Sequence, residues 1–151
     1  MNEILLGIIL SFTPIFEMQA GIPLLYHGGI PLWWAFIISI AFNTLAFPIT
    51  YLFLNYLHKH FLKFRKYEQL FQHFEERYKR KIEHKIGTAW EYWTLLIFVM
   101  LPGPGTGAYA GSFLSWLFKL NKKKSFFAIT LGMIINGLLV LLITYGVVII
   151  F

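Results

Sequence analysis

The charged residues of this chain are gathered into a few short stretches, and long apolar runs lie between them. Residues 4–16, 18–58, 92–118 and 125–151 contain no Lys, Arg, Asp or Glu. A transmembrane helix needs about 20 apolar residues, and the last three runs reach that length. The pattern therefore predicts an all-α integral membrane protein.

Two of the apolar runs contain residues that break helices. Near the middle of residues 92–118 lie Pro102, Gly103, Pro104, Gly105 and Gly107. Proline lacks the N–H donor that a helix needs, and glycine is a poor helix former. Irregular backbone at membrane depth is tolerated only where protein or a water-filled cavity satisfies it. Residues 4–26 are interrupted in the same way, at Pro14.

Positive charge sets the expected topology. Of the 13 Lys and Arg residues, nine lie in residues 58–91 and four in residues 119–124. Basic loops mark the cytoplasmic side, so the run 92–118 should begin and end there. Two full spans need roughly 40 residues, and this run is too short for them. A re-entrant helical hairpin that opens from the cytoplasm satisfies both constraints.

Applied to the whole chain, this reasoning predicts two inverted repeats in a single membrane domain. Residues 1–57 and 92–151 each form a re-entrant helical hairpin followed by a transmembrane helix, in opposite orientations. Residues 58–91 form a basic, amphipathic, cytoplasmic helix that joins them. Both termini of this multi-pass protein of the cell inner membrane are expected outside. Inverted repeats with discontinuous helices are a transporter architecture, with the site near the midplane.

The joining segment carries a regular apolar face. Residues at spacings of three or four form it: Phe61, Phe64, Tyr67, Phe71, Phe74, Tyr78, Ile82 and Ile86. Such a helix either lies in the membrane interface, with its cations toward anionic lipids, or packs on the spans and only marks the cytoplasmic side. The net charge of +6 arises from these basic loops, so it does not indicate a nucleic-acid partner.

Glu17 is the first candidate for chemistry, since it and His27 are the only ionisable residues inside an apolar segment. A charge at the bilayer centre is costly, and no Lys or Arg in an apolar segment can pair with it. Burial favours the neutral carboxyl, so Glu17 is a candidate for proton coupling. Alternatively, Glu17 lies near the outer interface, or is a neutral carboxyl bonded to Asn43 or Gln19.

The second break is a candidate for ligand binding. The N-terminus of its second limb offers free N–H groups and the positive end of a helix dipole, which favour an anionic group. Thr106 is expected to be the N-cap. Pro102, Gly105 and Gly107 allow the backbone to approach a ligand closely. The alternative is a tight turn whose glycines serve only packing.

Polar residues within the two spans are further candidates. Asn43 and Asn136 lie at comparable depth, and they either satisfy free backbone groups of the broken hairpins or contact substrate. Gln19 is expected to make local contacts beside Glu17. The chain has no Cys, no spacing typical of a metal site and no nucleophile–base pair. We therefore expect no enzyme activity, no metal and no cofactor.

These motifs resemble a known family. The motifs Pro14-x-x-Glu17-x-x-x-Gly21-Ile-Pro23-Leu and Leu101-Pro-x-Pro-Gly-Thr-Gly-Ala108 are similar to those of the small multidrug export proteins of bacteria and archaea. That family is similar in pattern to the DedA/VTT membrane proteins. The resemblance implies a small inner-membrane transporter with two re-entrant loops. Family members are expected to carry a basic residue where this chain has Gln19, so a Glu–Arg pair is not available here.

Together these features predict a proton-coupled secondary transporter. Its substrate is expected to be an amphipathic or anionic small molecule, or a lipid phosphate, bound between the two loops. Membrane lipids and a second copy of the chain are the expected partners, because two spans leave much of the broken backbone uncovered. The alternative is a scaffold or assembly factor that transports nothing.

Overall fold

The computed structural model describes residues 3–14, 16–82, 87–88, 90–103 and 105–150, and this part of the chain is helical without strands. The elements in order are α1 (Glu3–Ser11), α2 (Glu17–His27), α3 (Leu32–Thr44), α4 (Ala46–Leu52), the π-helix η1 (Phe53–Leu57), α5 (His58–Phe61), α6 (Arg65–Ile82), α7 (Glu91–Met100), α8 (Ala108–Leu117) and α9 (Lys122–Ile150). The prediction of an all-helical protein is confirmed.

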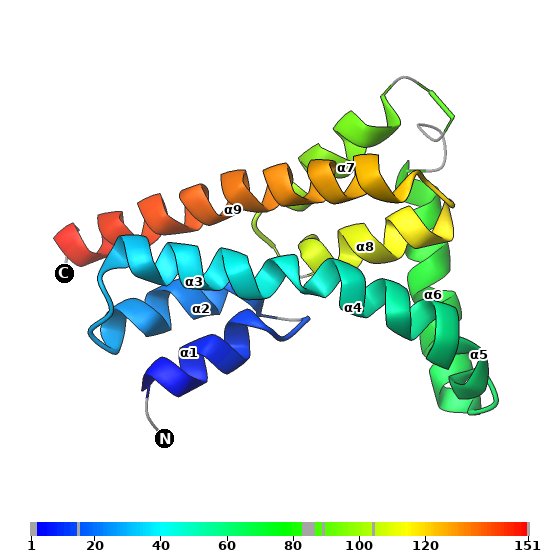
Figure 1. Ribbon diagram of the computed structural model, residues 1–151, viewed down its shortest axis with the longest axis horizontal. Coiled ribbons are helices and arrows are strands. Elements are labelled where there is room, and N and C mark those ends of the chain that lie inside the picture. The colour runs from blue at the N-terminus through cyan, green and yellow to red at the C-terminus, as the bar shows by residue number, and fades with distance from the viewer. Residues whose placement is uncertain (1–2, 15, 83–86, 89, 104, 151) are drawn as a thin grey trace.

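Two stretches are long and apolar enough to cross a membrane. They are Leu32–Phe61, which runs from α3 into α5, and Lys122–Gly146 within α9. Figure 1 shows that α3–α4 and α9 lie along the long axis of the molecule and run in opposite directions. The chain therefore has two candidate membrane helices, in the two spans that the hydropathy pattern predicts.

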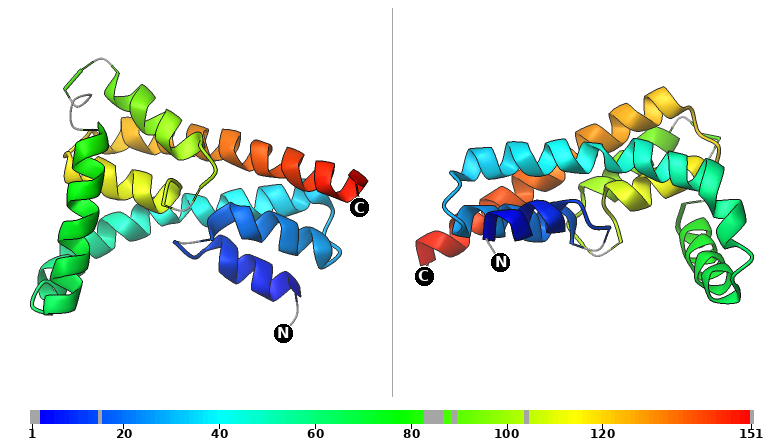
Figure 2. Two further views of the ribbon diagram at one scale, coloured as in Figure 1. Left: turned by 180° about the vertical axis from the view of Figure 1, so that it is seen from behind. Right: turned by 60° about the horizontal axis from the view of Figure 1, so that its bottom comes forward.

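Two pairs of shorter helices approach the middle of the molecule from opposite ends. The pair α1–α2 enters from the end that holds the start of α1 and the end of α9, and the pair α7–α8 enters from the other end (Figures 1 and 2). We call residues 12–14 and 16 the first tip, and residues 101–103 and 105–107 the second tip. The two tips meet near the middle, where most of the site lies.

Each tip follows from a local loss of helical hydrogen bonding. The α1 helix ends at Ser11, and the backbone N–H and hydroxyl of Thr13 both donate to the carbonyl of Leu10, at 3.1 and 2.8 Å. Pro14 then has no N–H to continue the helix. In the longer span, α3 ends at Thr44, the residue whose carbonyl would accept the N–H that Pro48 lacks.

The core lies where α9 packs against α2 and against α7. Its fully buried apolar side chains include Met18, Ile22, Leu25, Leu95, Val99, Ile129 and Met133. A Cβ built on Gly137 of α9 would lie only 2.8 Å from the Phe36 ring. Small residues permit such close helix approach in membrane proteins, so α9 holds both pairs of helices in place.

The joining segment is not one continuous helix. The α5 helix ends at Phe61, a turn covers residues 62–64, and α6 begins at Arg65. Residues 83–86 and 89, at the end of the predicted helix, lie outside the described part. The apolar face of α6 packs on α8, because the rings of Phe71 and Phe113 have centroids 5.4 Å apart. It also packs on the end of the first span, where the rings of Tyr67 and Phe53 have centroids 6.3 Å apart.

Candidate functional site

The carboxylate of Glu17 lies at the N-terminus of α8, across the junction of the two tips. Its Oε2 accepts a hydrogen bond from the backbone N–H of Ala108 at 3.2 Å, and its Oε1 accepts one from Tyr109 at 3.4 Å. Glu17 is only 5% exposed. The first N–H groups of a helix have no partner within it, and they carry the positive end of its dipole. Glu17 therefore caps a helix that lies ninety-one residues further along the chain.

Gly107 makes this arrangement possible. It is the N-cap residue of α8 and forms no side-chain cap bond. A Cβ built on Gly107 would collide with the carboxylate of Glu17. The glycine thus leaves the space that the carboxylate occupies.

The expectation that Thr106 caps α8 is wrong. Its hydroxyl donates backward, to the carbonyls of Leu101 and Gly103, at 2.8 Å each. Because Glu17 already supplies the cap, Thr106 closes the loop of its own tip instead. Thr106 is still next to the junction, because it directly precedes Gly107 in the chain.

Two further hydrogen bonds join the tips. The amide Nε2 of Gln19 donates to the carbonyl of Gly103 at 3.2 Å, and the hydroxyl of Tyr109 donates to the carbonyl of Phe12 at 2.6 Å. Gln19 therefore joins α2 to the second tip rather than making only local contacts. Sequence reasoning missed Tyr109, since a tyrosine beside an apolar helix has no feature that marks it.

Glu17 adopts an unusual backbone conformation. Its φ angle is +45°, in the left-handed region that residues other than glycine visit infrequently. Such conformations cost of order 1–3 kcal/mol and cluster at functional sites, where surrounding contacts impose them. The buried capping interaction with α8 is a contact that can hold Glu17 in this conformation.

Asn43 and Asn136 occupy equivalent places behind the two tips. Nδ2 of Asn43 donates to the carbonyls of Ser11 and Ser39, at 2.8 and 2.9 Å, and Nδ2 of Asn136 donates to that of Val99 at 3.0 Å. Ser11 ends α1, and Val99 is the penultimate residue of α7. Each asparagine thus satisfies a carbonyl that its broken helix leaves free.

A cavity of about 650 Å³ adjoins the junction. Pro14 and Gly105 line it from the two tips, and Tyr109 lines it from α8. The remaining walls come from α4, η1, α6 and α8, and are formed by Ile49, Thr50, Phe53, Leu54, Tyr67, Leu70, Phe71, Phe74, Arg77, Ala110 and Phe113. Ligand sites commonly have volumes of about 300–1,000 Å³ and apolar walls with a few polar groups.

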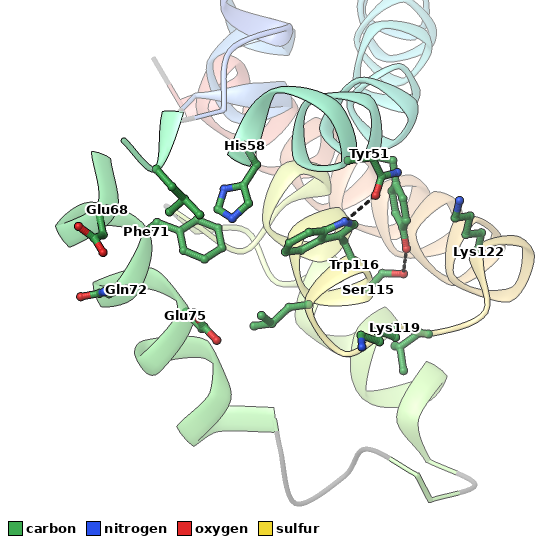
Figure 3. Close-up of a pocket in the computed structure, with 14 residues that line it drawn as sticks. Tyr51, His58, Glu68, Phe71, Gln72, Glu75, Ser115, Trp116, Lys119 and Lys122 are labelled. Carbon is green, nitrogen blue, oxygen red and sulfur yellow. Dashed lines mark hydrogen bonds between the residues drawn. The ribbon is translucent and has the colours of Figure 1, made fainter. Parts of the chain in front are cut away.

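A second cavity, of about 740 Å³, lies between α6 and the end of α8. Figure 3 shows the ring of His58 between Phe71 and Trp116, with ring centroids 4.1 and 5.5 Å away. The α6 side contributes Glu68 and Glu75, and the opposite side contributes Lys119 and Lys122. This second cavity has charges of both signs, unlike the cavity at the junction.

The remaining predicted residues are placed as follows. Pro102 is exposed in the second tip, and Pro104 lies outside the described residues. Asn43 and Asn136 do not line either cavity. Within the described residues, no three His, Asp or Glu side chains lie close enough together to hold a metal ion.

Comparison with known proteins gives one match. Residues 17–139 match the family model described as "Putative small multi-drug export protein". No curated protein and no solved structure matches the chain. The matched stretch begins at Glu17 and contains the whole of the second tip, so it includes both sides of the capping interaction.

Proposed function

The chain belongs to the family of small multi-drug export proteins, and on this premise we propose that it is a proton-coupled secondary transporter of amphipathic small molecules. The cavity at the junction holds the substrate. Glu17 carries the coupled proton. No catalytic step is part of the proposal.

The observation that carries this proposal is that Glu17 caps the N-terminus of α8, next to the wall of the cavity that Tyr109 forms. Tyr109 links the two, because its N–H donates to Glu17 and its side chain lines the cavity. An ionised carboxylate accepts stronger hydrogen bonds than a neutral one. A change in the charge of Glu17 therefore changes how firmly the tips are joined beside the substrate.

We infer the following cycle. With Glu17 ionised, its carboxylate occupies the N-terminus of α8 and the tips stay joined. A proton on Glu17 weakens these bonds, the tips separate, and the freed N–H groups of Ala108 and Tyr109 bind a polar group of the substrate. Loss of the proton restores the carboxylate, which displaces the substrate. Because the substrate binds only while Glu17 is protonated, one proton is carried together with each substrate molecule.

The other predicted residues act through the backbone. Pro14, Pro102 and Gly105 shape the tips that open. Thr106 and Gln19 hold the second tip, through the carbonyl of Gly103 that both contact. Asn43 and Asn136 support the fixed ends of the broken helices, so the tips move while these ends do not.

The arrangement of the helices supports a topology of two inverted repeats with re-entrant hairpins. The pairs α1–α2 and α7–α8 approach from opposite ends, and α3–α4 runs opposite to α9 (Figure 1). The basic segment 58–91 then lies in the cytoplasm, and both termini lie outside the inner membrane. A homodimer would cover the lipid-facing sides of the short helices, including Leu5 and Ile9 of α1, which are exposed.

Transport into and out of proteoliposomes tests the proposal. The full chain is reconstituted, and efflux of ethidium and of anilinonaphthalene sulfonate is followed with and without an imposed pH gradient. We expect one of the dyes to leave faster when the gradient is present. Glu17→Gln should abolish the dependence on the gradient, whereas Glu3→Gln, at an exposed position, should leave it unchanged.

Full gradient-driven efflux in Glu17→Gln would show that Glu17 carries no proton. If neither dye moves in the native chain under any gradient, the transporter proposal fails for both charge classes. The scaffold alternative makes the opposite prediction in cells. There, Glu17→Gln and Thr106→Ala should have little effect, and loss of the basic residues of 58–91 should be severe.

A further inference from the structure

The cavity at the junction has a single charged side chain among its described lining residues, and that side chain is a cation. Arg77 of α6 lines the cavity, together with apolar and aromatic side chains and three hydroxyl groups. Among the residues that the structure describes, no Glu lines it. The carboxylate of Glu17 is buried against the N-terminus of α8 and is not part of the wall.

The guanidinium of Arg77 is available to a ligand. The described part of the chain gives it no ion pair and no hydrogen bond, whereas its neighbour Arg80 lies 3.5 Å from Glu76. Arg77 is exposed on α6. An arginine can lay its apolar stem along such a wall while it presents its charge at the mouth of the cavity.

The hydroxyl groups of the wall do not offset this positive charge. The Tyr67 hydroxyl is hydrogen-bonded to Nδ1 of His58 at 3.0 Å, and the Tyr109 hydroxyl donates to Phe12. The Thr50 hydroxyl oxygen is buried and has no partner within the described residues, so it is not exposed to a ligand. Arg77 is therefore the polar group of this wall that can donate to an acceptor in the cavity.

From this inventory we infer that the cavity selects amphipathic anions: the apolar body of the ligand lies on Phe53, Phe74 and Phe113, and its acidic group lies at Arg77. The inference rests on the proposed function, because it names the charge class of the substrate of that site. An amphipathic cation of the same shape would meet Arg77 and find no carboxylate in the wall. Removing a charge from water without such a partner is costly.

Anion selection also agrees with the proposed cycle. When the tips separate, the N–H groups that Glu17 leaves belong to Ala108 and Tyr109, and Tyr109 lines the same cavity. These N–H groups favour a negative group. The ligand and the carboxylate of Glu17 then carry the same sign of charge and compete for the same donors.

Two probes of matched shape and opposite charge test the inference. Tetraphenylborate and tetraphenylphosphonium are equilibrated by dialysis with the full chain in detergent micelles, against micelles without protein. The pH is constant and no gradient exists. We expect tetraphenylborate to bind about tenfold more tightly, since one uncompensated charge contact is worth roughly 1.4 kcal/mol or more.

Substitutions of Arg77 should weaken the binding of tetraphenylborate, and one of them should strengthen the binding of tetraphenylphosphonium. Arg77→Gln should remove the preference for the anion, and Arg77→Glu should reverse it in favour of tetraphenylphosphonium. Arg80→Glu makes the same change of charge three residues away, outside the cavity wall, and should leave the preference unchanged. A reversed preference cannot result from a failure to fold.

Three results overturn the inference: an equal or stronger binding of the phosphonium by the native chain, an unchanged preference in Arg77→Glu, or an equal effect of Arg80→Glu. The outcome is separable from that of the transport assay. Anion-selective binding without gradient-driven efflux would refute the proposed transport function but not the anion site. Gradient-driven efflux with no preference for the anion would refute the anion site but not the transport function.

Discussion

The carboxylate of Glu17 occupies the space that a side chain on Gly107 would need. The two residues belong to different halves of the chain, and each determines what the other position can hold. Because Gly107 has no Cβ, the carboxylate reaches the N–H groups of Ala108 and Tyr109. This relationship gives the first of four predictions.

Gly107→Ala should separate the tips. The added methyl group collides with Glu17, so the two capping hydrogen bonds are lost and a buried carboxylate is left without them. Hydrogen bonds to charged groups contribute about 1.5–3 kcal/mol each, so we expect a loss of about 3 kcal/mol in unfolding free energy. Thermal unfolding of the purified chain in detergent measures it.

Gly146→Ala in α9 is the matched control for that change. A Cβ at this position meets no atom within 4 Å, and alanine favours a helix over glycine by roughly 0.5–1 kcal/mol. The control should thus be neutral or slightly stabilising. Equal melting temperatures for Gly107→Ala and the native chain would rule out the capping role of Glu17.

Tyr109→Phe should loosen the junction without removing its packing. The change deletes the hydroxyl that donates to the carbonyl of Phe12, while the edge-on contact between the two rings, with centroids 6.5 Å apart, remains. A loss of about 1 kcal/mol is expected from one neutral hydrogen bond. The control is Tyr145→Phe, at an exposed position on α9. If it lost as much unfolding free energy as Tyr109→Phe, the effect at Tyr109 could not be assigned to its hydrogen bond with Phe12.

Asn43→Ala and Asn136→Ala should each destabilise the chain by about 1–3 kcal/mol, because each change leaves a buried carbonyl without its donor. Asp at either position retains the shape of Asn but cannot donate when ionised, so it should not rescue the loss. Unfolding measurements on the Ala and Asp variants check both points. An Asp variant as stable as the native chain would contradict the role of the amide donors.

The proposed topology predicts that two particular positions face opposite sides of the membrane. The chain has no Cys, so Glu3→Cys and Lys123→Cys give single labelling sites. In oriented vesicles, a membrane-impermeant maleimide should label one of them from outside and the other only from the cytoplasmic side. Labelling of both from the same side would exclude inverted repeats with both termini outside.

The sequence predicts the helices well because their causes are local. The absence of charge in 125–151, the proline at position 14 and the cluster of prolines and glycines after Met100 each act on the backbone nearby. The helices accordingly break and resume near the predicted positions. The role of Asn43 and Asn136 at free carbonyls is also among the alternatives that sequence reasoning provides.

The partners across the junction could not be predicted in the same way. The N–H groups at a helix N-terminus need a hydrogen-bond acceptor. In the sequence the adjacent candidate is Thr106, but in the folded chain the acceptor is Glu17. Tyr109 and Arg77 matter through what lies beside them, and that depends on how α6 and the two tips pack. The joining helix was predicted without its turn at residues 62–64, because an apolar repeat continues across that turn.

The cap that Glu17 provides also imposes an order on biosynthesis. On the proposed topology, the first tip enters the bilayer before Ala108 and Tyr109 have been made, since ninety-one residues separate Glu17 from Ala108. At typical rates of synthesis, that delay is roughly 5 to 20 seconds. During this time an ionised Glu17 at membrane depth has no α8 N-terminus to bind. The nascent first hairpin must therefore hold a protonated glutamate or stay at the surface until the second hairpin arrives.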